Sequence, residues 1–253
     1  MDFDVLDLKM RAFEQSIDQF IPSDSYLVAR LDGRTFSRLT KEICKFEAPF
    51  DERFRDMMAE TVKALMDCGF KVLYGYTESD EISLLFHPEE NSFGRKVRKF
   101  NSILAGVASA TFSLQLGRLA TLDCRLVPLP NLESVKDYFM WRREDAHRNA
   151  LNAHCYWLLR KQGQDARTAN DMLEGKSVSF KTEFLLGNGI DFDTLPAWQK
   201  YGIGVYWADF EKVGINPITG AEERAIRRRL YIDYDFCASG DYDDRVVGFL
   251  ERL

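Results

Sequence analysis

The sequence predicts an α+β protein with a ferredoxin-like βαββαβ core and a mainly helical C-terminal part that ends in a β-hairpin. Short apolar runs of strand length alternate with longer segments of helical periodicity. Within the first 130 residues, only one pair of predicted strands is joined by a tight turn, at Thr77–Asp80. The chain has 253 residues, 45% hydrophobic and 29% charged, which indicates a folded chain of one large or two small domains.

The chain is expected to begin with an amphipathic helix that is followed by a buried strand. Apolar residues from Phe3 to Phe20 recur at alternating spacings of three and four, the pattern of one helix face. Residues 21–24 end this helix, and the run YLVARLD at 26–32 is typical of a buried strand. Helical stretches follow at 35–43 and after Asp51, which is expected to cap the second of them.

A hairpin and a second helix–strand unit complete the predicted core. Residues 70–76 and 81–86 are the expected hairpin strands, followed by a helix at 95–116 and an extended segment at 120–129. In a right-handed crossover the first two strands run parallel, so the return strand of the hairpin inserts between them. Because this unit supports many activities, function must be argued from the site.

Residues 131–253 are expected to pack on the core formed by residues 1–130, as an elaboration rather than a clearly separate domain. A long helix is predicted from Asn131 to about Arg160, and a short one at 168–173. Residues 201–213 and 228–236 are expected to form an antiparallel pair around the loop Asn216–Gly220.

Composition predicts a soluble, cytoplasmic protein with no membrane partner. No apolar run approaches the ~18 residues that span a bilayer, and acidic residues stand where a signal peptide would be basic. The five cysteines are widely spaced without a CxxC motif, which predicts reduced thiols and no zinc site. The net charge is −6, but a nucleic-acid partner requires only a local basic patch. Cations cluster at Arg95, Lys96, Arg98 and Lys99, and again at Arg224, Arg227, Arg228 and Arg229.

Acidic residues are expected to converge at one edge of the predicted sheet. Asp32 ends the first strand, and Asp80 begins the neighbouring return strand with Glu81 beside it. Carboxylates this close repel one another unless they are protonated or bridged by cations, and hard oxygen ligands suit Mg²⁺. Two such ions about 3.5–4 Å apart support in-line phosphoryl displacement. The alternative is structural, with Asp32 starting an Asp–Gly turn and Asp80 capping the hairpin.

The residues after Asp32 suit a phosphate group. Gly33 has no side chain, so a ligand can approach its backbone closely. The amides of residues 33–37 precede a predicted helix, whose dipole and free N–H groups favour anions. A nucleoside triphosphate held there would meet the cations on Asp32 and Asp80.

The basic stretch after the hairpin has two interpretations. Helical spacing places Arg95, Lys99 and Ser102 on one face, whereas Lys96 and Arg98 diverge from it. Such a segment is either a solvated helix face or a phosphate-binding surface. The absence of acidic residues between 91 and 101 favours phosphate binding.

Three motifs carry a family resemblance: RLDGRTF at 30–36, YGYTESDE at 74–81, and Trp141-Arg142 with Asp145 and Asn149. They resemble the tRNA-His guanylyltransferase family, which includes guanylyltransferase-like proteins that act as 3′-to-5′ RNA polymerases. The resemblance extends from the N-terminal helix to LPAWQ at 195–199, and the first two motifs are highly specific in this order and spacing.

The resemblance implies a palm-type catalytic core with two Mg²⁺ ions and the substrates tRNA, ATP and GTP. Asp32, Asp80 and the backbone carbonyl of Gly33 correspond to metal ligands, and Glu81 to a third catalytic acid. The 5′-monophosphate of tRNA is activated with ATP or GTP, and the 3′-hydroxyl of an incoming nucleotide then attacks the activated phosphorus. A homo-oligomer, commonly a tetramer, is also implied.

Further residues are assigned through the resemblance. Those expected to contact the nucleotide or its triphosphate are Gly33, Arg34, Thr35, Phe36, Ser37, Ser79 and Lys99. Those expected to contact tRNA or its 5′ end are Arg30, Lys45, Arg95, Lys96, Arg142, His147, Asn149 and Lys181. Two positions depart from the family: Ala48 replaces a frequent Lys, for which Lys45 would substitute, and Thr182 replaces the Asn of a Lys-Asn-Glu element.

The segment His147-Arg148-Asn149-Ala150 departs from the His-Ile-Asn-Asn of the eukaryotic tRNA-His enzymes. This departure favours the branch that repairs tRNA 5′ ends against a template, with strict guanylate addition to tRNA-His as the alternative. Two other classes stay open, a palm-domain nucleotide cyclase and a non-catalytic RNA-binding module. The long polar and basic part after Pro130 favours a macromolecular substrate over the cyclase, and an RNA-binding module would not need clustered acids.

Overall fold

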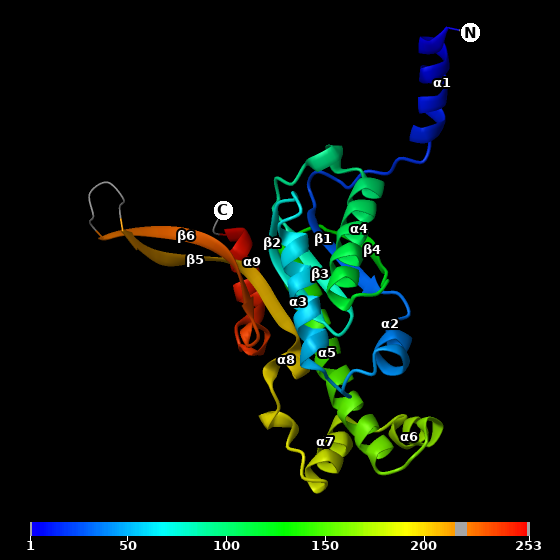
Figure 1. The fold of residues 1–253 in the computed structure, drawn as a ribbon, viewed down its shortest axis with the longest axis vertical. Coiled ribbons are helices and arrows are strands. Elements are labelled where there is room, and N and C mark those ends of the chain that lie inside the picture. Colours follow the sequence, from blue (N-terminus) through cyan, green and yellow to red (C-terminus); the bar gives the residue numbers. More distant parts are fainter. Residues whose placement is uncertain (1, 216–221, 252–253) are drawn as a thin grey trace.

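In the computed structural model, which describes residues 2–215 and 222–251, the chain forms one six-stranded sheet covered by helices on both faces (Figure 1). Every neighbouring pair of strands is antiparallel, and the strand order is β4-β1-β3-β2-β5-β6. The strands are β1 (Tyr26–Gly33), β2 (Val72–Glu78), β3 (Glu81–Phe86), β4 (Leu122–Leu129), β5 (Ile203–Ile215) and β6 (Glu222–Asp233).

The order of elements in the first half is the predicted one, and so is the position of the hairpin. Helix α3 (Glu52–Met66) follows β1 and precedes β2, and α4 (Val97–Leu116) joins β3 to β4. Strand β3 pairs with both β1 and β2 and so lies between them. The α+β class and the insertion of the return strand are therefore confirmed.

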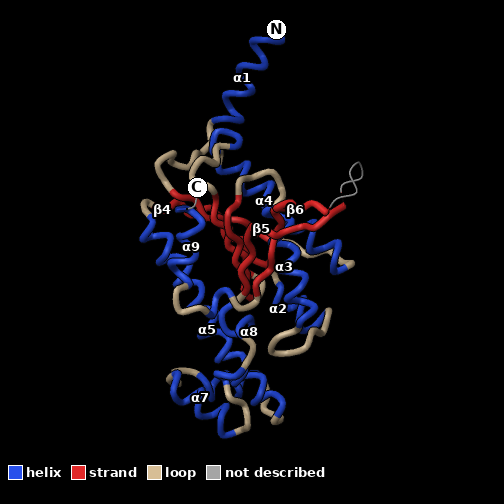
Figure 2. Tube along the Cα trace, turned by 90° about the vertical axis from the view of Figure 1, so that its left-hand side faces the viewer, coloured by secondary structure: helices blue, strands red, loops and turns tan. Residues whose placement is uncertain are grey.

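Two apolar layers hold the helices to the sheet (Figure 2). Because neighbouring strand residues point to opposite faces, Leu31 and Ile82 pack toward α3 and α4, whereas Val28 and Leu85 pack toward the other face. That face is covered by the long helix α5 (Leu132–Lys161) and by α9 (Tyr242–Glu251).

The second half of the chain both extends the sheet and builds a helical lobe. Strand β5 pairs with β2, so the β5–β6 hairpin belongs to the same sheet. A third cluster of buried residues joins the C-terminal half of α5 to the lobe, whose helices are α6 (Ala166–Leu173), α7 (Val178–Gly187) and α8 (Ala197–Tyr201).

Several boundaries differ from those predicted. Strand β6 begins at Glu222, earlier than the expected residue 228. It also ends earlier than expected, because Phe236 lies in a 3₁₀ turn. The predicted loop Asn216–Gly220 lies outside the described residues. Helix α1 (Phe3–Gln15) forms as expected but ends before Phe20, buries none of its residues and stands away from the body (Figure 1). Within the described ranges, no helix is long and apolar enough to cross a membrane.

Candidate active site

The end of β1 and the β2–β3 turn meet at one edge of the sheet, as the topology predicted. Asp32 is the register partner of Glu81, and the Gly33 amide donates to the Asp80 carbonyl oxygen at 3.1 Å. Burial raises the pKa of Asp80, and the negative charge of Asp32 contributes to that shift. The two carboxylates are therefore close enough to repel each other.

The segment after Asp32 is held more tightly than the sequence suggested. A Cβ on Gly33 would lie 2.4 Å from the Phe36 ring, so this glycine is required by the fold itself and not only by a ligand. The predicted helix at 35–43 is one α-helical turn, α2 (Phe36–Arg38), followed by a π-helical turn, η1 (Leu39–Ile43). The amides of Gly33 and Arg34 already donate to the carbonyls of Asp80 and Thr121. Among the described contacts, the backbone amides of residues 35–37 make no such hydrogen bond, so of the amides at 33–37 these three are the ones that could bind a phosphate.

Glu81 makes ion pairs with two arginines. Its carboxylate lies 2.5 Å from Nε of Arg142 on α5 and 3.6 Å from Nε of Arg30 on β1. Both guanidinium groups also lie over the Trp141 ring. Burial raises the pKa of Glu81, and this effect is larger than the lowering caused by the two arginines. Its contacts are those of a residue that positions Arg142 and α5.

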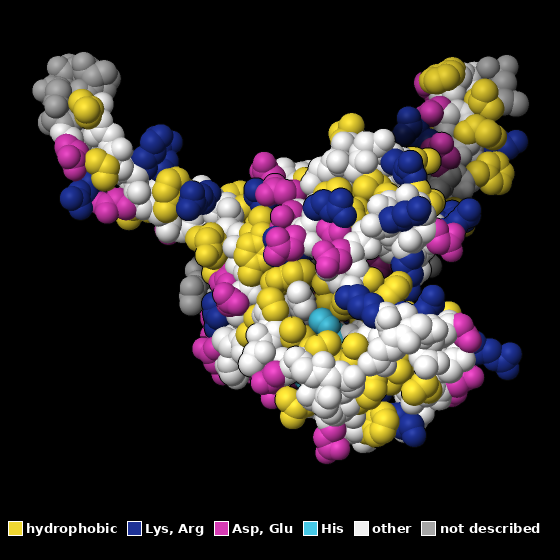
Figure 3. Space-filling model, turned by 60° about the horizontal axis from the view of Figure 1, so that its bottom comes forward, with side chains coloured by type: hydrophobic (Ala, Val, Ile, Leu, Met, Phe, Trp, Pro, Cys, Tyr) yellow, Lys and Arg dark blue, Asp and Glu magenta, His cyan; other side chains and the backbone are white. Residues whose placement is uncertain are grey.

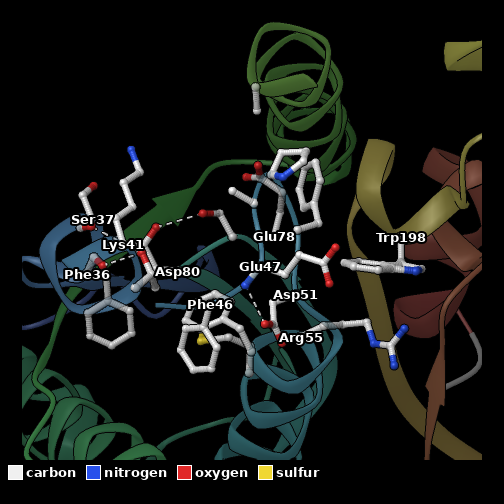
Figure 4. Close-up of a pocket in the computed structure, with 18 of the residues that line it drawn as sticks. Phe36, Ser37, Lys41, Phe46, Glu47, Asp51, Arg55, Glu78, Asp80 and Trp198 are labelled. Atoms are coloured by element: carbon white, nitrogen blue, oxygen red, sulfur yellow. Dashed lines mark hydrogen bonds between the residues drawn. The ribbon is translucent and has the colours of Figure 1, made fainter. Parts of the chain in front are cut away.

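A cavity of about 560 Å³ opens beside Asp80 (Figure 4). Ser37 and Asp80 lie on one side of it, and Arg55 and Trp198 on the other. Of the predicted site residues, those that line the cavity are Phe36, Ser37, Lys45, Ser79 and Asp80. It is large enough for a nucleotide.

The cavity also contains residues that sequence reasoning missed, among them Lys41, Glu47, Arg55, Glu78 and Trp198. Burial, followed by the charge of Glu81, raises the pKa of Glu78 to about 8. The Arg55 guanidinium lies 4.8 Å from the centroids of both the Trp198 and Tyr234 rings. Glu78 and Trp198 belong to the quoted motifs and could have been chosen, whereas nothing local in the sequence marks Arg55.

The basic stretch after the hairpin lies at the opposite end of β1, which corrects its predicted placement at the triphosphate. Arg95 is buried, and its guanidinium donates to the carbonyls of Ser23 and Ser25, just before β1 begins. Asp32 lies six residues beyond Tyr26, the first residue of β1, which is about 20 Å at the rise of a strand. Helix α4 begins only at Val97, so Arg95 and Lys99 do not share a helix face.

The absence of acids around this stretch was also misleading, because the acid comes from another segment. Asp18 forms ion pairs with Lys96 at 2.8 Å and with Arg98 at 2.5 Å. The Lys99 ammonium lies over the Phe93 ring at 5.7 Å, at the same end of the sheet. Within one chain, Arg95, Lys96 and Lys99 are therefore remote from a phosphate held at Asp32.

The other residues assigned to tRNA lie along α5 and in the helical lobe. His147 stacks on Tyr201 with ring centroids 5.1 Å apart and the rings nearly parallel. The Asn149 amide donates to Asp145 at 3.3 Å. The Lys181 carbonyl accepts from the buried Cys155 thiol. These three residues do not join the carboxylate site in the described structure.

Asp32, Asp80 and the Gly33 backbone offer the hard oxygen donors that Mg²⁺ prefers. A cation between the two carboxylates would offset the repulsion that contributes to the raised pKa of Asp80. Among the residues that the structure describes, no three His, Cys, Asp or Glu side chains form a metal cluster, but Mg²⁺ is usually bound by one or two carboxylates together with waters and substrate phosphates. The residues present fit the ion.

Comparison with known proteins assigns the chain to a family. A family model described as tRNAHis guanylyltransferase matches residues 7–133, and one described as Thg1 C terminal domain matches residues 133–230. The tRNA(His) guanylyltransferase of Debaryomyces hansenii is 32% identical over an alignment of 234 residues, and the match covers 87% of this chain and 87% of that protein.

Solved structures agree with this. A bacterial tRNA(His) guanylyltransferase-like protein in complex with GTP has a TM-score of 0.72 at 25% identity, covering 97% of this chain and 99% of that chain. The tRNA(His) guanylyltransferase of Saccharomyces cerevisiae has a TM-score of 0.71 at 26% identity, covering 77% and 91%. This chain belongs to the tRNA-His guanylyltransferase family and is a nucleotidyltransferase.

Proposed function

We propose that this protein is a Mg²⁺-dependent guanylyltransferase that adds guanylate to the 5′ end of tRNA-His, at the position before the first nucleotide. The observation that carries the proposal is the meeting of Asp32 and Asp80 beside a nucleotide-sized cavity, in a chain of this family. The β4-β1-β3-β2 order supports a palm-like, ferredoxin-type core. The family assignment displaces the cyclase and the non-catalytic RNA-binding module.

The chain's own residues are suited to bind and orient a nucleotide. Aromatic rings of Phe46 and Trp198 line the cavity and offer faces for a purine base. Lys41 lies beside Ser37 (Figure 4), and Lys45 also lines the cavity, so a triphosphate bound there would gain from positive charge. When bound at Asp32 and Asp80, Mg²⁺ supplies charge neutralisation at the transferring phosphoryl group.

The reaction then proceeds in two displacements. A 5′-phosphate oxygen of the tRNA attacks the α-phosphorus of ATP or GTP, and pyrophosphate leaves. The 3′-hydroxyl of the incoming GTP loses its proton and attacks the activated 5′-phosphorus, and the nucleoside monophosphate leaves. Holding the hydroxyl in line with the leaving group supplies much of the rate.

Two contacts in the structure support guanylate addition over templated repair, because they account for the altered residues in another way. The preference for templated repair depended on the altered His147–Ala150 segment, but Ala150 is buried in the helical-lobe core and Arg148 is paired with Asp145 on its own helix at 2.9 Å. Packing and a helix-surface ion pair therefore account for these two substitutions without a template. The relatives named as tRNA(His) guanylyltransferases support guanylate addition better.

The test uses 5′-monophosphorylated tRNA-His that lacks the added nucleotide, incubated with ATP and one labelled nucleoside triphosphate at a time. The base opposite the addition site is varied through all four identities. We expect guanylate to be added whatever base lies opposite, and tRNA-Phe to be a poor acceptor. If the added nucleotide follows the opposing base on both tRNAs, the repair interpretation replaces this one. A homo-tetramer, proposed from the family, is checked by light scattering.

A further inference from the structure

Trp141 on α5 lies beside the carboxylate edge of the sheet with 49% of its surface exposed. The guanidinium groups of Arg142 and Arg30 lie 4.5 and 5.8 Å from the centroid of its ring. The ring also meets the Tyr138 ring edge to face, and the Tyr138 hydroxyl shares a hydrogen bond of 2.9 Å with the buried Ser83. Trp141 is therefore anchored to the sheet, while about half of it remains available to a ligand.

The surface around Trp141 belongs to the same face of the sheet as Asp32. Alternate strand residues point to one face, and Val28 of β1 packs toward α5, so Arg30 and Asp32 point that way too. On the neighbouring strand β4, Arg125 is the register partner of Arg30, and its side chain is 52% exposed. We call the surface formed by Trp141, Arg30 and Arg125 the platform. It includes no residue of α1 or of the β5–β6 hairpin, the two segments that project from the body (Figure 3).

The platform and the nucleotide-sized cavity lie on different sides of the carboxylate pair. Asp80 lines the cavity, whereas Asp32 and the three platform residues do not. The strand order β4-β1-β3-β2 places β1, with Asp32, between Arg125 on β4 and Asp80 at the β2–β3 turn. In an in-line phosphoryl displacement, the attacking and leaving oxygens lie on opposite sides of the phosphorus. A nucleotide in the cavity therefore leaves the platform side for the other reactant.

We propose that the platform stacks the base of the first nucleotide of the RNA substrate, so that its 5′-phosphate lies at Asp32. The proposal rests on the proposed function, which supplies an RNA with a reacting 5′-phosphate. An aromatic ring beside guanidinium groups is a combination that stacks bases in RNA-binding sites. Arg125, whose ion pair with Asp123 is exposed to solvent, adds a cation for the adjoining phosphates. Arg30 and Asp32 are about 6.6–6.8 Å apart along β1, so one nucleotide spans the distance from the platform to the carboxylate.

Stacking on the platform distinguishes the end of an RNA from its interior. A base within a duplex has both faces covered by its neighbours, whereas the terminal base has one open face that Trp141 can cover. Because every base has a π-face, stacking is tolerant of sequence. The platform therefore positions the 5′ end without reading its identity, and we expect the four possible first bases, each paired, to give similar affinities.

The test is a double-mutant cycle between Trp141 and the first base of the RNA. The full-length wild type and Trp141→Ala are given 5′-monophosphorylated tRNA-His whose first nucleotide is either intact or abasic. We expect Trp141→Ala to raise the KM for intact tRNA by about 5- to 100-fold, with the KM for GTP and the kcat nearly unchanged. Removal of the base should raise the wild-type KM by a similar factor. It should raise the KM of Trp141→Ala much less, since the stacking partner is already gone.

Two further variants separate stacking from a structural role. Trp141→Tyr keeps an aromatic ring and should keep most of the affinity for intact tRNA. Phe93→Ala removes a ring that is 51% exposed, with Lys99 at 5.7 Å from its centroid, at the opposite end of the sheet, and should leave the KM for tRNA unchanged. The slope of log affinity against log salt, which we call the salt slope, should equal that of the wild type in all three variants, because no cation is removed.

The outcomes distinguish this inference from the proposed function. Wild-type protein that extends intact tRNA, with additive effects of the two changes in the cycle, overturns the inference and leaves the proposed function standing. A KM for GTP that rises as much as the KM for tRNA, or a lowered melting temperature without rescue by Trp141→Tyr, assigns Trp141 to holding Arg142 and also overturns the inference. Wild-type protein that extends no tRNA overturns both.

Discussion

Arg142 on α5 and Glu81 on β3 form an ion pair of 2.5 Å that joins the helical layer to the sheet edge beside Asp32. Both side chains are nearly removed from solvent, at 6% and 13% exposure. Arg142 also pairs with Asp145 at 3.0 Å, so one guanidinium bridges two carboxylates. The orientation of the active-site edge therefore depends on this arginine.

Arg142→Ala is expected to lower the free energy of unfolding by about 3 kcal/mol, because it leaves the buried Glu81 carboxylate with only the longer ion pair to Arg30, at 3.6 Å. Urea denaturation at pH 7 measures this. In the double variant with Glu81→Gln, part of the loss should be recovered, since no unpaired carboxylate remains at position 81. Strict additivity of the two single changes would show that the residues are not coupled.

Asp80→Asn is expected to abolish nucleotide addition while leaving the protein as stable as the wild type, or more so. Because burial and Asp32 raise the folded-state pKa of Asp80, the ionised carboxylate at pH 7 is a cost to the fold, and a neutral amide removes that cost. The melting temperature without Mg²⁺ should therefore not fall. The rise in melting temperature on adding Mg²⁺, expected for the wild type, should disappear.

A matched control is Asp123→Asn, on the neighbouring strand β4 and also a register partner of Asp32. Its side chain is exposed, so we expect activity and Mg²⁺ response to be retained. A large loss of activity in this control, equal to that of Asp80→Asn, would contradict a metal site restricted to Asp32 and Asp80.

The meeting of Asp32 and Asp80 could be predicted because it follows from strand periodicity and crossover handedness alone. Both are local or topological rules, and neither requires side-chain packing. The ion pair of Glu81 with Arg142 could not be predicted in this way, because it joins residues 61 positions apart through the docking of α5. The position of Arg55 in the site could not be predicted either, because the rings around it come from distant segments, α8 and the residues after β6.

Charge patterning was informative in one place and misleading in another. The arginine cluster at 224–229 does form an exposed surface, since the hairpin leaves the body. The cluster at 95–99 does not form one surface, because Asp18 compensates two of its cations and Arg95 turns inward. Counting acids near a basic run along the sequence omits acids that the fold brings from elsewhere.

Stability at acid pH should depend on Asp51, the N-cap of α3. Its carboxylate accepts hydrogen bonds from the Arg53 side chain and from the amides of Glu47 and Arg53, and these lower its pKa well below the usual range, with the Arg53 side chain the largest cause. A lowered folded-state pKa means that the stabilisation is fully present above the unfolded value of about 3.9 and is lost as the pH falls through the folded value.

Asp51→Asn keeps a capping oxygen but not the charge, so the variant should be less stable than the wild type at pH 7 and approach it below about pH 4. Asp51→Ala removes the cap as well, and should cost about 1 kcal/mol more at every pH. Urea midpoints between pH 3 and 7 measure both. A difference between wild type and Asp51→Asn that stays constant over this range would exclude the charge as the cause.

Substitution of Arg95 and substitution of Lys99 are expected to affect stability differently, although the sequence assigns both residues to phosphate or tRNA binding. Arg95→Ala removes buried hydrogen bonds to the carbonyls of Ser23 and Ser25 and should lower the free energy of unfolding by about 1–3 kcal/mol. Lys99→Ala removes a side chain that lies over the Phe93 ring and should leave stability nearly unchanged. Thermal and urea unfolding of the two variants, measured beside their tRNA salt slopes, distinguishes an anchor of the chain from a phosphate contact. Equal stability of the two variants, with an equal loss of salt slope, would return Arg95 to the RNA surface.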